Sequence, residues 1–365
     1  MRVPFVDLNA AYIELKAELD EAIQRVLDSG WYVLGAEVER FEEEFAAYCG
    51  ARHAIGVGTG LDALTLALIA LDIGQGDEVL VPSNTYIATW LAVSHSGALP
   101  VPVEPNEGTC NIDGTAIESA ISERTKAIIP VHLYGQPADL DPILDVARGF
   151  GLAVVDDAAQ AHGAEYKGKR VGTHADATAF SFYPTKNLGA FGDGGAITTN
   201  CDNLARKIRL LRNYGSQQKY VHEIAGFNSR LDPLQAAMLS VKLARLDDWN
   251  NRRRDIAMEY TRAISRSPLQ PVALIKGVNP VWHVFAVKHP DRDNFRNRLE
   301  ASGISTMVHY PVPPHMQAAY ANLKLPPSSL PVAKKLGQEL LSLPIGPHMK
   351  ADEVEYVAEC IVKYS

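Results

Sequence analysis

Short runs of strand-forming residues alternate with segments of helical periodicity over residues 53–200, and this alternation constrains the fold more than any other feature. The runs occupy 53–58, 78–82, 99–103, 126–132, 152–157, 178–183 and 195–200. Between the first two, one apolar face at helical spacing is formed by Leu61, Leu64, Leu68 and Leu71. Because strands that alternate with helices are typical of α/β proteins, the sequence predicts a mostly parallel sheet with flanking helices.

The pattern changes after Asn200, where helical periodicity extends over 202–212 and 233–265. A smaller α+β unit follows, with a strand near 282–288, a helix near 291–302, a proline-rich loop and a final helix from 351. We therefore predict a large domain over residues 1–245 and a small C-terminal α+β domain over 246–365, bridged by a long helix. The length of 365 residues agrees with two domains at roughly 150 residues each.

The composition of the chain argues against nucleic acid and membranes as binding partners. The formal net charge is −8, so the chain offers no bulk attraction to nucleic acid or to an anionic membrane surface. The four cysteines are widely spaced, which favours free thiols in a reducing compartment over disulfides or a zinc site. We find no signal peptide and no apolar stretch of the roughly 20 residues that span a bilayer. The expected location is the cytoplasm.

Several familiar motifs are incomplete. Gly56, Gly58 and Gly60 follow a predicted strand, but the third glycine comes one residue too early for the G-x-G-x-x-G fingerprint of dinucleotide binding. The 11 histidines have no metal-ligand spacing, so no metal is expected. The basic run NNRRRD at 250–255 is interpreted as a solvated helix face rather than a diphosphate site.

The region that carries chemistry begins where the run LAVVDD ends in two aspartates. An acid at the carboxyl end of a buried strand lies where open α/β sheets bind ligands. Further along, Lys186 lies between Pro184 and Gly189 on irregular backbone that can hold its amine at a fixed point. Such a lysine and carboxylate suit pyridoxal phosphate (PLP) chemistry. The residues alone also allow a surface lysine and an aspartate that caps a helix.

Three longer strings extend this pattern: VVDDAAQAHGA, SFYPTKNLGAFGDGGAITTN and GFNSRLDPLQAAML. Together they resemble the sugar aminotransferases of the DegT/DnrJ/EryC1/StrS family, and the likeness runs from Pro4 to the VHYPVPPH segment at Val308. The resemblance implies a PLP enzyme of the aspartate-aminotransferase fold (fold type I) that acts on nucleotide-linked keto-sugars.

The resemblance also implies roles for residues around the cofactor ring. Lys186 corresponds to the catalytic lysine that forms a Schiff base with the cofactor aldehyde. Asp157 corresponds to the carboxylate that pairs with the pyridinium nitrogen, and Gln160 is expected near the phenolic oxygen of the ring. Tyr86 matches the family's aromatic residue that stacks on the ring, although a core aromatic at a helix start is an alternative interpretation.

For the cofactor phosphate, Gly60 and Leu61 lie in a tight turn at a predicted helix N-terminus, where backbone amides and the helix dipole favour an anion. Ser181 matches the position whose hydroxyl joins them. Asn228 matches an asparagine that reaches the phosphate from the neighbouring subunit. The resemblance therefore implies a homodimer with shared active sites.

Substrate-binding positions carried over from related enzymes are Tyr183, Lys219, His309 and Tyr310, of which Lys219 is expected to come from the other subunit. These residues could equally be solvated loop residues.

The expected reaction transfers an amino group from L-glutamate to a keto-sugar. The motifs most resemble the branch that aminates C-3 of a dTDP-linked 3-keto-6-deoxyhexose. Amination at C-4 of a UDP-, GDP- or dTDP-linked 4-keto-sugar is the alternative. A sugar dehydratase on the same fold is disfavoured, because those enzymes carry histidine where this chain has Lys186. The intact set of cofactor residues also argues against a binding protein without catalysis.

Overall fold

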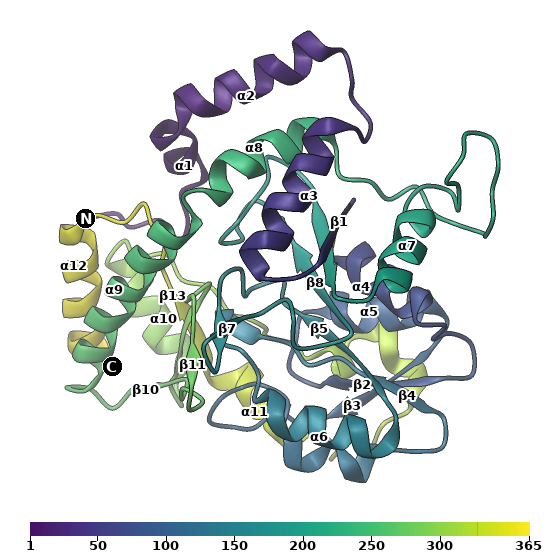
Figure 1. Ribbon diagram of the computed structural model, residues 1–365. Helices are drawn as coiled ribbons and strands as arrows, with labels where there is room; N and C mark the ends of the chain where they lie inside the picture. Colours follow the sequence, from purple (N-terminus) through teal and green to yellow (C-terminus); the bar gives the residue numbers. More distant parts are fainter. Residues whose placement is uncertain (327) are drawn as a thin grey trace.

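The computed structural model describes residues 1–326 and 328–365, which fold around a seven-stranded sheet (Figure 1). The strand order is β1-β9-β8-β5-β4-β2-β3, with bounds β1 (His53–Val57), β2 (Glu78–Pro82), β3 (Leu99–Val103), β4 (Thr125–Ile128), β5 (Ala153–Asp157), β8 (Ala177–Ser181) and β9 (Gly195–Thr199). Strand β9 pairs antiparallel with β1 and β8, and the other neighbouring pairs are parallel. The predicted mostly parallel sheet is confirmed, and each predicted run overlaps one strand to within one residue at its start.

Helices cover both faces of this sheet. Side chains alternate along β8, so Ala177 and Ala179 join one apolar cluster while Phe180 joins another on the opposite face. The first cluster is covered by α4 (Gly60–Ala70), α5 (Ile87–Ser96) and α7 (Asp202–Leu211). The opposite face is covered by α3 (Ala36–Cys49), α6 (Leu140–Phe150) and α8 (Pro233–Leu243). Helix α4 is buried almost all round, because it packs against the sheet, α5 and α7 together.

A second, smaller antiparallel sheet has the order β10-β12-β13. Its strands and packed helices are β10 (Gln270–Pro271), β12 (Phe285–Lys288), β13 (Leu340–Leu343), α9 (Leu246–Ile264), α10 (Arg292–Ala301) and α12 (Ala351–Tyr364). The helical stretch predicted over 233–265 is two helices, because α8 ends before Ala244 and α9 begins at Leu246. Val3 belongs to this small core and pairs with Ile304, although it lies at the start of the chain.

Further short elements connect these parts. Strand β11 (Val278–Asn279) pairs with β6 (Glu165–Tyr166), which forms a hairpin with β7 (Lys169–Arg170). Helix α11 (Pro331–Glu339) precedes β13. Helices α1 (Leu8–Glu14) and α2 (Lys16–Ser29) lie at the edge of the molecule, where α2 packs along α8 (Figure 1). Among the described residues, no helix is both long and apolar enough to cross a bilayer.

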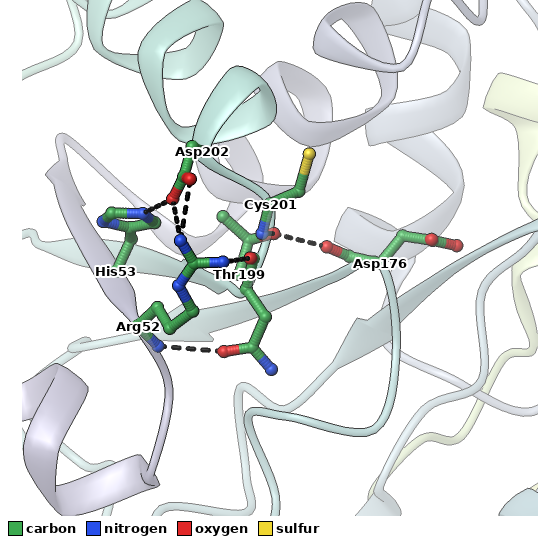
Figure 2. A network of polar contacts seen from close by, with 7 residues as sticks. Arg52, His53, Asp176, Thr199, Cys201 and Asp202 are labelled. Atoms are coloured by element: carbon green, nitrogen blue, oxygen red, sulfur yellow. Dashed lines mark hydrogen bonds and ion pairs between the residues drawn. The ribbon is translucent and has the colours of Figure 1, made fainter.

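A polar network holds β1 and β9 in register at the end of the sheet where β1 begins (Figure 2). Asp202, at the start of α7, accepts hydrogen bonds from Arg52 Nη2 at 2.6 Å and lies 2.7 Å from His53 Nε2. These contacts hold the pKa of Asp202 below its usual range. Thr199 Oγ1 donates to the carbonyl oxygen of Asp176 at 2.7 Å. At its other end, β1 stops at Val57 and leads directly into the turn before α4, which begins at Gly60.

Candidate active site

The main sheet ends at a cavity of about 610 Å³. It lies at the carboxyl ends of β1, β2, β5 and β8, where parallel sheets present loop residues to ligands. The small unit closes it with residues 307–310 and Ile345. The structure brings most of the predicted site residues to its wall, namely Gly60, Leu61, Tyr86, Asp157, Gln160, Ser181, Tyr183, Lys186, His309 and Tyr310.

The two aspartates that end β5 have different environments, because successive strand residues face opposite sides. Asp156 is fully buried, with Oδ2 3.6 Å from His132 Nε2. Asp157 lines the cavity, where its carboxylate accepts hydrogen bonds from Thr89 Oγ1 at 2.8 Å and the Ala159 amide at 3.1 Å. Burial raises the pKa of Asp157, and these hydrogen bonds and the charge of Lys186 partly oppose that shift.

Lys186 follows β8 in a loop whose backbone turns back, with the Lys186 amide donating to the Tyr183 carbonyl oxygen at 2.8 Å. Its Nζ makes no hydrogen bond within the described part of the chain. Burial lowers the pKa of the Lys186 amine to about 8, and the charge of Asp157 opposes the shift. At pH 7 about one tenth of the amine is therefore unprotonated, against far less than 1% for an exposed lysine, and the unprotonated form is the nucleophile.

The N-terminus of α4 forms an anion-binding turn. Thr59 caps the helix by accepting from the Asp62 amide at 3.0 Å, which leaves the amides of Gly60 and Leu61 facing the cavity. The turn packs tightly on the end of β8: a Cβ on Gly60 would lie 2.5 Å from Ser181 Cβ. The missing side chain thus lets the turn approach Ser181, which lines the same cavity.

One wall is built from hydrogen-bonded side chains of both units. Gln160 accepts from the Tyr134 amide at 2.7 Å and donates through Nε2 to Tyr310 Oη at 3.2 Å. His309 Nδ1 lies 2.8 Å from Ser342 Oγ. Burial lowers the pKa of His309 to about 4, with a further contribution from Lys186, so His309 is neutral. This wall is held in place before any ligand binds.

The opposite wall carries Tyr86, the residue before α5. Its side chain is 55% exposed, and its ring centroid lies 5.3 Å from that of Tyr310. Interpreting Tyr86 as a core aromatic is therefore wrong. The ring offers a flat apolar surface at the cavity, as a stacking partner for a ligand ring would.

Two predicted residues do not line the cavity of the same chain. Lys219 and Asn228 are exposed on the segment between α7 and α8, which projects from the body of the molecule (Figure 1). Next to Asn228, Ser229 accepts from the Gly58 amide at 3.0 Å and donates to Asp62. The base of the segment is thus attached to the anion-binding turn, while Asn228 is exposed and does not line the cavity.

The basic run at 250–255 contains a residue that the sequence analysis misinterpreted. Arg253 is only 6% exposed and lines the cavity, so a fully solvated face is wrong for this position. His283 lines it too, and its pKa lies well below the usual value through burial and the charges of Lys186 and Arg253. Helical spacing would have indicated Arg253, because the buried stripe of α9 runs Leu246, Trp249, Asn250, Arg253, Ile256, Ala257 and Tyr260.

These features fit PLP on the geometry of the chain itself. The amine of the half-buried Lys186, which has no hydrogen-bond partner in the described part of the chain, lines the same cavity as the buried carboxylate of Asp157, and the amides at a helix start suit a phosphate. Within the described residues, no group of three or more histidine, cysteine or acidic side chains could hold a metal ion.

Comparison with known proteins defines the class. Residues 14–362 match the DegT/DnrJ/EryC1/StrS aminotransferase family, and the chain belongs to this family. It is 54% identical to the dTDP-3-amino-3,4,6-trideoxy-alpha-D-glucose transaminase of Streptomyces venezuelae, over 100% of this chain and 96% of that protein. It is 52% identical to the dTDP-3-amino-3,6-dideoxy-alpha-D-galactopyranose transaminase of Aneurinibacillus thermoaerophilus, over 99% of each chain.

Solved structures agree. The structure of S. venezuelae DesV in complex with a ketimine intermediate matches with a TM-score of 0.98 and 54% identity, covering 100% of this chain and 98% of that one. The structure of NtdA from Bacillus subtilis with bound pyridoxamine phosphate matches with a TM-score of 0.92 and 32% identity, covering 100% and 85%. The predicted fold type I is confirmed, and the protein is an aminotransferase that uses PLP.

The lowered pKa of Lys186 predicts how fast the cofactor-free protein captures PLP. The rate rises with pH and levels off above about 8, because only the unprotonated amine attacks an aldehyde. Stopped-flow absorbance measures this profile. In Asp157→Asn the midpoint moves to lower pH, because the charge that raises the pKa of Lys186 is gone. A midpoint near 10, as for an exposed lysine, would contradict the assignment.

The packing of the anion-binding turn predicts a strong effect of one methyl group. Gly60→Ala forces the turn away from Ser181, and PLP affinity falls on the order of 10- to 100-fold, because the amides move away from the hydroxyl. Gly149→Ala is the matched control, since a Cβ on Gly149 of α6 meets nothing within 4 Å. Equal PLP dissociation constants for Gly60→Ala and wild type would refute the proposed phosphate position.

Proposed function

We propose that this protein transfers the amino group of L-glutamate to C-3 of a dTDP-linked 3-keto-6-deoxyhexose and yields a dTDP-3-amino-3,6-dideoxyhexose. The observation that carries the proposal is full-length identity above 50% to two enzymes whose names specify dTDP-3-amino sugars. The Lys186–Asp157 pair, facing one cavity, supplies the residues that such a reaction needs.

In the first half-reaction the amino donor gives up its nitrogen and one proton. When bound, PLP supplies an aldehyde that accepts the nitrogen and a ring that takes up the electron pair of the broken C–H bond. Lys186 Nζ, with its pKa near 8, accepts the proton from the α-carbon of L-glutamate. Asp157 would hold a proton on the ring nitrogen of bound PLP, and the amides of Gly60 and Leu61 would hold its phosphate. The donor leaves as 2-oxoglutarate.

In the second half-reaction the keto-sugar receives the nitrogen. Lys186 Nζ delivers a proton to the sugar carbon that carries it, so the same amine acts as base and acid. We assign contacts with the sugar to Tyr183, His309 and Tyr310, and their position in the lining of the same cavity as Lys186 supports this assignment. The neutral imidazole of His309 can donate or accept a hydrogen bond at neutral pH.

We further propose a homodimer in which Asn228 and Lys219 complete the site of the other subunit. Both residues are exposed and lie away from the cavity of their own chain. The segment that carries them also exposes Tyr220, which is 84% accessible, and Phe227. A second exposed apolar group follows α2 at Trp31, Tyr32 and Val33, and large exposed apolar surfaces mark contacts between proteins.

The proposed location is the cytoplasm. Cys49, Cys110, Cys201 and Cys360 are all free thiols, and Cys201 is exposed. Free exposed thiols persist where the compartment is reducing.

The substrate is tested in a single-turnover half-reaction. The pyridoxamine phosphate form is mixed with 3-keto and 4-keto sugars linked to dTDP or UDP, and the return of PLP absorbance is followed. We expect the fastest conversion with the dTDP-linked 3-keto-6-deoxyhexose. If a 4-keto-sugar is converted faster, the proposed amination at C-3 is wrong and the enzyme aminates C-4. Lys186→Ala, which lacks the amine that moves the proton, is the inactive control.

Shared active sites predict complementation between two defective variants. Lys186→Ala and Asn228→Ala homodimers each lose activity, but a refolded equal mixture recovers about one quarter of wild-type activity. The mixed dimers carry one site with both intact residues, so the recovery requires subunit sharing. Activity no higher than the average of the two homodimers would place Asn228 outside the partner's site.

A further inference from the structure

Arg253 occupies an unusual position for an arginine. It lies on the buried stripe of α9 and borders the active-site cavity near Ile345. Its Nη1 donates to the carbonyl oxygens of Ile345 at 2.9 Å and Trp282 at 3.3 Å. These bonds fix the guanidinium at the junction of the two units and leave its other donors for a ligand.

Arg253 has no carboxylate partner among the described residues. Its neighbours on the helix are satisfied: Arg252 pairs with Glu14, and Arg254 donates to Asn251. Burial lowers the pKa of Arg253 to about 10, so the group is still charged at neutral pH. A buried charge without a counter-ion is costly, which favours a site that an anion fills during function.

The guanidinium shares its surroundings with the reacting amine. Arg253 and Lys186 line the same active-site cavity, and both also border a second, smaller cavity of about 300 Å³. Burial lowers the pKa of His283, and the charges of both Lys186 and Arg253 lower it further. The carboxylate of Asp157 is engaged elsewhere, since it accepts hydrogen bonds from Thr89 and the Ala159 amide. The deep part of the cavity therefore favours an anionic ligand close to Lys186.

The chemistry of the ligands decides which anion fits. A nucleoside diphosphate needs the open mouth of the cavity, whereas Arg253 is only 6% exposed. The cofactor phosphate has its own site at Gly60, Leu61 and Ser181. In an α-amino acid, however, the carboxylate is bonded to the carbon that carries the amine, so it must lie beside the reacting nitrogen. A planar guanidinium matches a carboxylate with two parallel hydrogen bonds.

We propose that Arg253 binds the α-carboxylate of the amino donor and so selects α-amino acids as the source of nitrogen. This assignment rests on the proposed aminotransferase function. It makes Arg253 a substrate-binding residue for one half-reaction and leaves the sugar half-reaction to other residues.

The test compares the two half-reactions in Arg253→Gln. With L-glutamate and the PLP form, KM rises on the order of 10- to 100-fold while kcat changes less, because a charge-assisted contact is lost. With L-glutamine as a second donor, KM rises by the same factor in the variant as it does with L-glutamate. The sugar half-reaction of the pyridoxamine phosphate form and the dissociation constant of PLP stay within about threefold of wild type. Arg253→Lys, which keeps the charge, recovers part of the loss.

Arg254→Gln is the matched control, because Arg254 is the next residue on the helix and also bonds a carbonyl oxygen but does not line the cavity. An unchanged KM for L-glutamate in Arg253→Gln, or a parallel loss in both half-reactions and in PLP affinity, overturns the assignment. An effect on L-glutamate without one on L-glutamine also overturns it, because the side-chain carboxylate would then be the ligand.

Two further measurements distinguish a folding defect of the variant, or a failure of the proposed function, from a wrong role for Arg253. If Arg253→Gln does not fold, Arg253→Lys decides: a raised KM for the donor alone supports the assignment, and a wild-type KM overturns it. The wild-type enzyme reports on the proposed function by itself. If no α-amino acid converts its PLP form, the proposed function fails and the role of Arg253 fails with it. If another α-amino acid serves, the same variant comparison is made with that donor.

Discussion

The electrostatic coupling between Asp157 and Lys186 is the interaction on which the rest of the site depends. Burial raises the pKa of the carboxyl and lowers that of the amine, and the charge of each partly opposes the shift of the other. Both side chains reach one cavity because β5 and β8 are adjacent parallel strands whose loops leave the same edge of the sheet. The parallel sheet thus determines where the chemistry takes place.

The remaining contacts hold ligands around this pair. The turn at Gly60 packs against Ser181, which ties the end of β1 to the end of β8. Gln160 is held between Tyr134 and Tyr310, so that residues of the small unit are joined to the main sheet. Arg253 adds a charge at the same junction. One wall therefore combines residues of both units, and a displacement of one unit would change that wall.

Much of this could be predicted from the sequence, for a physical reason. The strands of the main sheet are continuous apolar runs bounded by turns, because parallel strands are buried on both faces. The aspartate pair at the end of β5 marked the site, and the longer strings marked the family.

The charged residues of α9 were harder to interpret. Charge alone indicated a solvated face, whereas the spacing from Leu246 to Tyr260 places Asn250 and Arg253 on the buried stripe. Helices α1 and α2 expose most of their residues, and the helical spacing of the buried Leu19, Ala22 and Val26 of α2 was a signal that the sequence analysis did not use. Residues supplied by a second subunit, such as Asn228, leave no pattern within one chain.

The most direct test follows the nitrogen atom itself. Nitrogen-15-labelled L-glutamate is incubated with the enzyme and a dTDP-linked 3-keto-6-deoxyhexose, and the sugar product is examined by NMR. The proposed function requires the label bonded to C-3, with 2-oxoglutarate formed in equal amount. Label at C-4, or no label in the sugar while the Lys186 site holds PLP, would contradict it.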